Sequence, residues 1–124
     1  VPNPSEPLTN LDIDGNSRFD ALSDGLILLR LMFGLTGQSL TNGVTAPDAN
    51  FIYSGDLIQR FNSTDLLLDI DDDKSIDALT DGLLILRYLF GIRGENLSTN
   101  ALSPSAERNA VSELEEYLQY LITQ

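Results

Sequence analysis

The sequence predicts an all-α fold built from two copies of one loop-and-helix unit, with about four helices in all. The first observation behind this prediction is internal repetition. The segment Leu11–Asp14 recurs as Leu68–Asp71, an offset of 57 residues. Between residues 11–37 and 68–94, 15 of 27 positions are identical without a gap. Such a match indicates a tandem duplication, so the two copies are expected to fold alike.

The second observation is an apolar helical pattern inside each unit. It predicts a first helix over about residues 21–33 and its copy over about 78–90. Because most faces of these helices are apolar, we expect them to be buried and central. One stripe of the first helix holds Leu22, Leu26, Leu29 and Phe33. Glycines that stop the two helices follow at Gly34, Gly37, Gly91 and Gly94.

Each unit also carries a second helix. It is short in the first copy, at about 55–62, and longer in the second, at about 109–122. Pro47 and Pro104 mark the connections before these helices, because the residue before a proline disfavours helix. The longer helix has an apolar stripe made of Val111, Leu114, Leu118 and Leu121.

The length of the chain allows one hydrophobic core rather than two independent ones. We therefore expect a single domain over 8–124, with repeats at about 8–64 and 65–121, in which the two apolar helices pack about a pseudo-twofold axis. The Pro-rich start, residues 1–7, is typical of an extended linker. It predicts fusion to a larger secreted polypeptide.

Composition excludes several classes of function. The chain has 7 basic and 19 acidic residues, a formal net charge of -12, and neither cysteine nor histidine. Without a basic stripe we expect no nucleic-acid binding, and an anionic membrane surface would repel the chain. Disulfides, zinc fingers and Cys- or His-based nucleophiles are excluded. The longest apolar runs, 26–29 and 83–86, are too short for membrane insertion. The natural partner of clustered carboxylates is a cation.

The third observation is an acidic loop directly before each apolar helix. Numbered from Asp12 and Asp69 as position 1, oxygen-bearing side chains recur at positions 3, 5, 9 and 13. An EF-hand loop supplies calcium with oxygens from positions 1, 3, 5, 7, 9 and 12, and position 7 offers only its backbone carbonyl. The predicted ligands, for two calcium ions per chain, are Asp12, Asp14, Asn16, Arg18, Asp20, Asp24, Asp69, Asp71, Asp73, Ser75, Asp77 and Asp81.

Two features depart from the EF-hand pattern. The closing acid stands at position 13 rather than 12, and position 12 is Ser23 in the first loop and Thr80 in the second. Position 6 is usually Gly, since the turn there needs a positive φ, yet it is Ser17 or Lys74, at a strain of about 1 kcal/mol each. An interpretation without metal stays open, in which the acids are a solvated surface run or favour the helix dipole. Magnesium is a weaker candidate than calcium, because it prefers fewer protein ligands.

The loops and the helices after them resemble the dockerin family. The opening segments 12–16 and 69–73, with the apolar helices at 26–31 and 83–89, are similar to its duplicated motif, D-x-N-x-D-G-x-x-N/D-x-x-D before a Leu-rich helix. The similarity covers about 27 residues per unit, and the connections and second helices are longer than is usual in that family. It implies a secreted, extracellular module that binds calcium at the residues above and attaches to a cohesin-like protein.

Several functions stay open. One is a non-catalytic calcium-binding module that mediates calcium-dependent protein–protein interaction; the alternative is a calcium-stabilised spacer without a dedicated partner. The repeated pairs Ala21-Leu22 and Ala78-Leu79, early in the apolar helices, form either a symmetric docking surface or part of the core. A calmodulin-like sensor is less favoured, since such grooves are Met-rich and Met32 is the single methionine. We expect no enzyme, because nothing sets a pair of acids opposite one another. For the equivalent Arg30 and Arg87 three roles stay open: pairing with a loop carboxylate, capping a backbone carbonyl, or contacting a partner.

Overall fold

The computed structural model describes residues 2–124, so Val1 of the predicted linker lies outside the described residues. Residues 2–124 form helices and turns without a strand, which confirms the all-α prediction. None of the helices described is long and apolar enough to cross a membrane. In chain order the elements are the π-helical turn η1 (Ala21–Gly25), α1 (Leu26–Met32), α2 (Gly37–Thr41), α3 (Ser54–Asn62), the 3-10 turn η2 (Leu66–Leu68), the π-helical turn η3 (Ala78–Gly82), α4 (Leu83–Leu89), α5 (Glu95–Ser98) and α6 (Val111–Leu121).

The four predicted helices are all present. They are η1 with α1, then α3, then η3 with α4, and α6. Residues 2–124 nevertheless hold six α-helices rather than about four, because α2 and α5 are additional. Both begin at or directly after a glycine that was expected only to stop the preceding helix, Gly37 or Gly94. These glycines have positive φ values of 58° and 73°, so the chain turns there and then winds once more.

The equivalent arginines Arg30 and Arg87 hold the two short helices in place. Nη1 of Arg30 donates a hydrogen bond to the carbonyl oxygen of Asn42 at 2.8 Å, and Nη1 of Arg87 donates one to Thr99 at 2.7 Å. The last carbonyls of a helix lack partners within it, and a cationic side chain satisfies them well. These two arginines therefore cap carbonyls at the ends of α2 and α5, which is one of the roles left open from the sequence.

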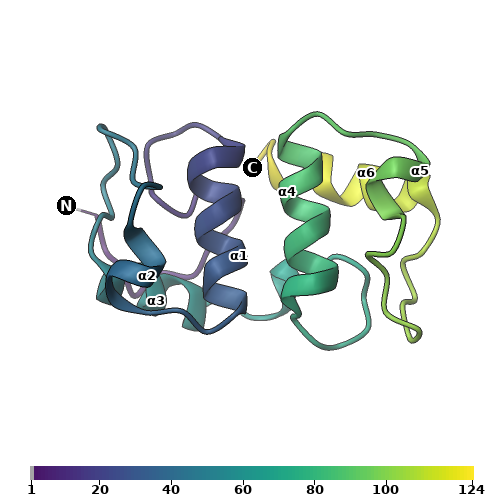
Figure 1. Cartoon of the computed structure of the whole chain (residues 1–124), viewed down its shortest axis with the longest axis horizontal. Coiled ribbons are helices and arrows are strands. Elements are labelled where there is room, and N and C mark those ends of the chain that lie inside the picture. Colours follow the sequence, from purple (N-terminus) through teal and green to yellow (C-terminus); the bar gives the residue numbers. More distant parts are fainter. Residues whose placement is uncertain (1) are drawn as a thin grey trace.

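The two copies lie side by side, with α1 and α4 next to each other at the centre of the molecule (Figure 1). The start of each apolar helix packs on the end of the other. A Cβ atom on Gly25 would lie 2.9 Å from Cδ1 of Leu86, and one on Gly82 would lie 2.7 Å from Cδ1 of Leu29. The glycines therefore let the two helices, which run in opposite directions, pack closely against each other. These contacts are reciprocal, whereas the pseudo-twofold axis stays a prediction.

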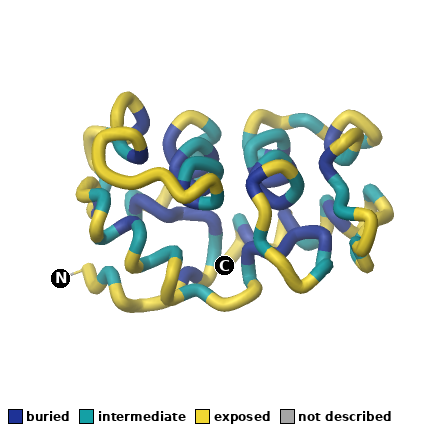
Figure 2. The backbone as a smooth tube through the Cα atoms, turned by 60° about the horizontal axis from the view of Figure 1, so that its bottom comes forward, coloured by how far each residue is buried: buried dark blue, intermediate teal, exposed yellow. Residues whose placement is uncertain are grey.

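The apolar helices are not buried all round, contrary to the expectation. Leu22 is 64% exposed and Phe33 is 52% exposed, although both belong to the predicted stripe of the first helix. The buried side of α1 instead carries Ile27, Leu28 and Leu31. The reason is that α2 and α3 cover α1, α5 and α6 cover α4, and the two apolar helices pack on each other, which leaves part of each helix uncovered. Buried stretches of the backbone accordingly alternate with exposed ones along both copies (Figure 2).

The last helix, α6, joins the second copy to the first loop. Its predicted stripe is confirmed, because Leu114, Leu118 and Leu121 are fully buried and Val111 is half-buried. The backbone N–H of Leu11 donates to the carbonyl oxygen of Leu121 at 3.2 Å. The C-terminal end thus returns to the middle of the molecule, beside the start of the first acidic loop (Figure 1).

Candidate metal centre

The first acidic loop brings three carboxylates together. Asp12, Asp14 and Asp24 each place a carboxylate oxygen within 4.8 Å of the others, and all three residues are buried. Asp12 and Asp14 come from the loop and Asp24 from the turn η1. Oxygens at this spacing from three separate chain positions could hold a metal ion.

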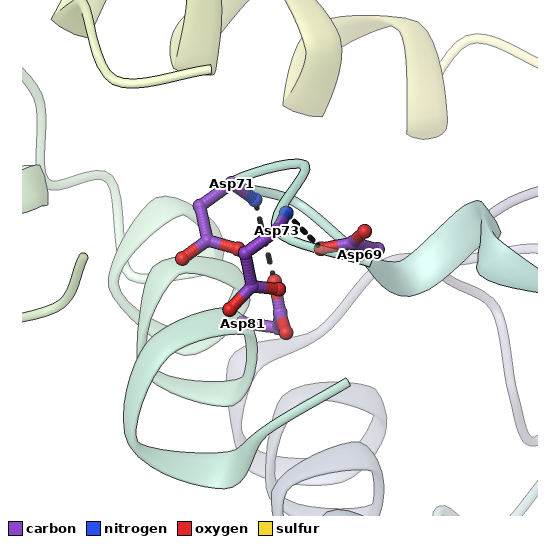
Figure 3. A group of neighbouring side chains, drawn as sticks. All are labelled: Asp69, Asp71, Asp73 and Asp81. Atoms are coloured by element: carbon purple, nitrogen blue, oxygen red, sulfur yellow. Dashed lines mark hydrogen bonds between the residues drawn. The ribbon is translucent and has the colours of Figure 1, made fainter. Parts of the chain in front are cut away.

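The second loop gathers four carboxylates in the same way, those of Asp69, Asp71, Asp73 and Asp81 (Figure 3). Asp69, Asp71 and Asp81 are buried, and Asp73 is half-buried. Hydrogen bonds from the backbone N–H groups of Asp71 and Asp73 to Asp81 and Asp69 hold the carboxylates in place, at 3.3 and 3.2 Å.

Two π-helical turns explain how an acid at position 13 closes each loop. In η1 the N–H of Gly25 donates to the carbonyl of Asp20, and in η3 the N–H of Gly82 donates to Asp77, both at 3.1 Å. This spacing of five residues accommodates one residue more than an α-helical turn. Oδ2 of Asp24 then accepts the N–H of Asp20 at 2.9 Å, as the equivalent acid does in the second copy. The extra residue is thus absorbed within the turn, and the closing acid joins the other carboxylates.

The winding of each loop depends on the aspartate at position 1. Asp12 Oδ2 accepts the N–H of Ser17 at 2.7 Å, and Asp69 Oδ2 accepts the N–H of Lys74 at 2.8 Å. Ser17 has a φ of 64° and Lys74 a φ of 70°, which confirms the positive φ expected at position 6. Each residue is strained by about 1 kcal/mol in this region.

One acid of the first loop lacks a hydrogen-bond partner within residues 2–124. Among the described residues, neither carboxylate oxygen of the fully buried Asp14 has a hydrogen-bond partner, and in the second loop Oδ1 of Asp71 is likewise without one. Buried polar atoms are nearly always paired, because an unpaired one costs free energy. A cation at these oxygens would supply the missing partner. The residues present therefore fit a metal ion.

The electrostatics of the carboxylates point the same way. Burial raises the pKa of Asp14 to about 8, with a further contribution from the charge of Asp24. Burial likewise raises the pKa values of Asp24 and Asp71 to about 6 and of Asp81 to about 7. Desolvation disfavours the charged carboxylate, and a neighbouring negative charge adds to that effect. A bound cation would stabilise the charged carboxylates and so counteract both the desolvation and the repulsion.

Other predicted ligands lie outside the two carboxylate groups. Asp20 is half-buried and Asp77 is exposed, and neither contributes an oxygen to its group. The amide of Asn16 donates to Oδ1 of Asp48 at 3.2 Å, while its own oxygen accepts the N–H of Arg18 at 3.1 Å. The side chains of Arg18 and Ser75 are exposed, so only their main chains could serve the centre.

Two further residues at the loops were not foreseen. Nε and Nη2 of Arg60 donate to the carbonyls of Ile13 and Asp12, both at 2.9 Å. Nη1 of Arg108 donates to Ile70 at 2.7 Å and to Asp69 at 3.3 Å. Both arginines thus bind the carbonyls of positions 1 and 2. An offset of 57 does not relate them, so the repeat gave no signal that could have found them.

Comparison with protein-family models, curated proteins and solved structures finds no match to this chain. The interpretation of the two clusters therefore depends on their own geometry and chemistry.

Proposed function

We propose that this chain is a non-catalytic calcium-binding module with one site in each repeat. The observation that carries the proposal is Asp14, whose buried carboxylate has two oxygens without a partner among the described residues and lies with Asp12 and Asp24. Asp71 is the equivalent buried acid of the second site. Asn16 and Asp73 are candidate ligands at position 5, and Asp20 and Asp77 at position 9. Arg18 and Ser75 would contribute backbone carbonyls.

Calcium is favoured over other cations by the donor set. Every side-chain donor proposed is an oxygen, and calcium takes six to eight oxygens in flexible geometry. Magnesium prefers to keep several waters and uses fewer protein ligands. Two calcium ions would change the formal net charge from -12 to -8, which relieves repulsion that opposes the compact state. Extracellular calcium modules typically bind at about 10⁻⁴–10⁻³ M, and a secreted location would suit sites of that affinity.

The purpose of the bound calcium is calcium-dependent protein–protein interaction, with a cohesin-type partner as the resemblance to dockerins implies. Two equivalent leucines support a recognition surface, because Leu22 is 64% exposed and Leu79 is 62% exposed. Each stands at position 11 of its loop, between the acids at positions 9 and 13, so loop folding would position both. The second candidate function is a calcium-stabilised spacer, favoured by the burial of the clusters themselves, which ties the ions to folding rather than to a surface.

Calorimetric titration and thermal unfolding test the calcium proposal. We expect two calcium ions per chain and a marked fall of Tm in chelator, because each occupied site adds about 2.7 kcal/mol at a free ion concentration of 100 Kd. Asp65→Asn is the matched control, since Asp65 is exposed and belongs to neither carboxylate group. It should bind calcium like the parent. Equal melting curves with and without chelator, and no heat of binding, would contradict the proposal.

A panel of cohesin domains separates the two purposes. An interaction module should bind at least one of them with calcium and lose that binding in chelator. Replacement of both Leu22 and Leu79 by lysine should weaken the complex while leaving calcium stoichiometry at two. Binding of calcium without binding of any cohesin would favour the spacer.

A further inference from the structure

In each copy, an arginine that is stacked on an aromatic ring donates hydrogen bonds to the backbone of the acidic loop. The guanidinium of Arg60 lies 4.1 Å from the ring centre of Phe51, and that of Arg108 lies 3.9 Å from the ring centre of Tyr117. Both guanidinium groups donate to the carbonyls of loop positions 1 and 2, as described above. The ring leaves the edge of the guanidinium free for these hydrogen bonds while it covers the face.

The two pairs are built from exchanged residues. The offset of 57 carries Phe51 onto Arg108 and Arg60 onto Tyr117. In the first copy the aromatic residue lies in the connection and the arginine in α3; in the second the arginine lies in the connection and the aromatic residue in α6. The chemical identities at two positions have been swapped, yet the guanidinium reaches the same two loop carbonyls.

A third position varies with the pair. Position 4 of the loop is Gly15 in the first copy, and a Cβ there would lie 2.9 Å from Cδ2 and Cε2 of Phe51. The equivalent residue in the second copy is Asp72, also at a positive φ, of 54°. The charge of Arg108 there helps to lower the pKa of Asp72, after the larger effect of its hydrogen bond from Lys74. Glycine thus leaves room for the phenyl ring in the first copy, and in the second an acid stands there under the influence of the Arg108 charge.

The connection also contacts the loop through its backbone, whichever side chain it carries. The N–H of Phe51 donates to the carbonyl of Asp14 at 3.1 Å, and the N–H of Arg108 donates to that of Asp71 at 3.0 Å. This main-chain contact is identical in the two copies. The side chain from α3 or α6 then completes the contact with a ring or a guanidinium, and the backbone is ready to accept either arrangement.

We propose that the guanidinium–ring pair is a positioning device for the carboxylate loop, and that its two members can be exchanged as a unit between connection and helix. The guanidinium fixes the carbonyls of positions 1 and 2, and thereby aims the carboxylates of positions 1 and 3 into the cluster. Because the guanidinium stays charged at all ordinary pH values, it also offsets repulsion among those carboxylates. The effect on calcium rests on the proposed function, whereas the effect on the metal-free loop does not.

The test exchanges the pair in the first copy, in a chain whose second site is disabled by Asp71→Asn. Arg60→Tyr alone removes the guanidinium, and we expect calcium affinity at the first site to fall about tenfold or more, as for other residues that orient ligands. The double exchange Phe51→Arg with Arg60→Tyr should recover affinity to within about threefold of the parent, and addition of Gly15→Asp should improve the recovery. Thermal unfolding in chelator should show the same loss and recovery of Tm.

Arg93→Tyr is the matched control, because Arg93 also stacks on a ring, that of Tyr88 at 3.5 Å, but binds no loop carbonyl. It should leave calcium affinity unchanged. Losses that simply add in the double variant, or no loss in Arg60→Tyr, would overturn the proposal. If Arg60→Tyr fails to fold, a folded double exchange still supports it, and an unfolded one overturns it. If the parent binds no calcium, the calcium proposal fails, and the recovery of Tm in chelator alone then tests the positioning role of the pair. The failure of one proposal can therefore be told apart from the failure of the other.

Discussion

The two acidic loops share their backbone but differ in how their charges are compensated. In both, the aspartate at position 1 accepts the N–H of position 6, and a π-helical turn brings in the acid at position 13. At position 3, however, Oδ2 of Asp71 accepts the backbone N–H of Ser103 at 2.9 Å, whereas among the described residues Asp14 has no such donor. Burial accordingly raises the pKa of Asp14 to about 8 and that of Asp71 only to about 6.

The difference shows that winding and charge are set by separate groups of atoms. Backbone hydrogen bonds to the first and last acids fold both loops alike. Side-chain oxygens that take no part in this winding are free to vary between the copies. Position 5 is an amide in the first copy, Asn16, and a carboxylate in the second, Asp73. The second cluster therefore carries four acids against three. Calcium affinity follows ligand charge and rigidity, so we expect the second site to bind more tightly.

Removal of the acid at position 3 should have the largest effect on calcium binding and on the difference in stability between the two loops. Asp14→Asn and Asp71→Asn should each abolish one of the two calcium sites at ion concentrations that saturate the parent, a loss of about 2.7 kcal/mol of stabilisation or more. In chelator the two variants should differ. At about pH 8 and above, where Asp14 is ionised, Asp14→Asn removes a buried charge without breaking a hydrogen bond, so it should raise Tm, whereas Asp71→Asn weakens the charge-assisted bond from Ser103 and should gain less.

Titration calorimetry counts the remaining site in each variant, and calorimetric melting in chelator gives the stability. Asp65→Asn again serves as the control. A chelated Asp14→Asn protein that melts well below the parent would show that the carboxylate has a structural partner, and would contradict the account of an uncompensated charge.

The next largest effect is expected on the pH dependence of thermal stability in chelator. The pKa values of Asp14, Asp24, Asp71 and Asp81 lie above the ordinary value of 3.8, so the folded state binds protons more tightly than the unfolded state. The resulting stability is complete below about pH 4 and is lost as pH rises through 6 to 8, at about 1.4 kcal/mol per pH unit for each proton difference. Tm in chelator should therefore fall between pH 5 and pH 8, and saturating calcium should flatten that fall.

The loops should differ within this range. The decline above pH 7 should come mainly from the first loop, because only Asp14 has its pKa raised to about 8. Melting curves of Asp14→Asn in chelator from pH 5 to pH 8 test this point. The variant should lose the decline above pH 7 and keep a shallower decline below it, from the remaining three carboxylates. A parent protein that is more stable at pH 8 than at pH 5 without metal would reverse the sign and refute the explanation.

Much of this arrangement was predictable from sequence. The offset of 57 and the acids at positions 1, 3 and 13 led to the groups around Asp14 and Asp71, because a duplicated pattern of acids leaves few other interpretations. The π-helical turn could not be foreseen, since nothing in the residues distinguishes it from an α-helical turn. Nor could the exposed face of α1, because a helix that is apolar all round does not reveal which side its neighbours cover. Arg60 was hidden because its equivalent is Tyr117.

An exchange at position 5 should sharpen the comparison by a smaller amount. Asn16→Asp gives the first cluster a fourth carboxylate, and Asp73→Asn takes one from the second. We expect calcium affinity to rise about tenfold at the first site and to fall about as much at the second, since affinity follows ligand charge. Titration of each variant with the opposite site disabled measures both changes. Equal affinities for amide and carboxylate would show that position 5 does not reach the ion.

The smallest effect is expected at position 6. Ser17 and Lys74 both have positive φ, so glycine should relieve up to about 1 kcal/mol of strain at either position, less the entropy that a more flexible unfolded chain loses on folding. Lys74 also forms exposed ion pairs with Asp72 and Glu107, which its replacement would lose, and Ser17 has no comparable pair among the described residues. Ser17→Gly should therefore stabilise the chelated protein slightly, and Lys74→Gly should leave it nearly unchanged. Denaturant unfolding measures both. A larger gain from Lys74→Gly than from Ser17→Gly would mean that the ion pairs contribute nothing and that strain alone distinguishes the loops.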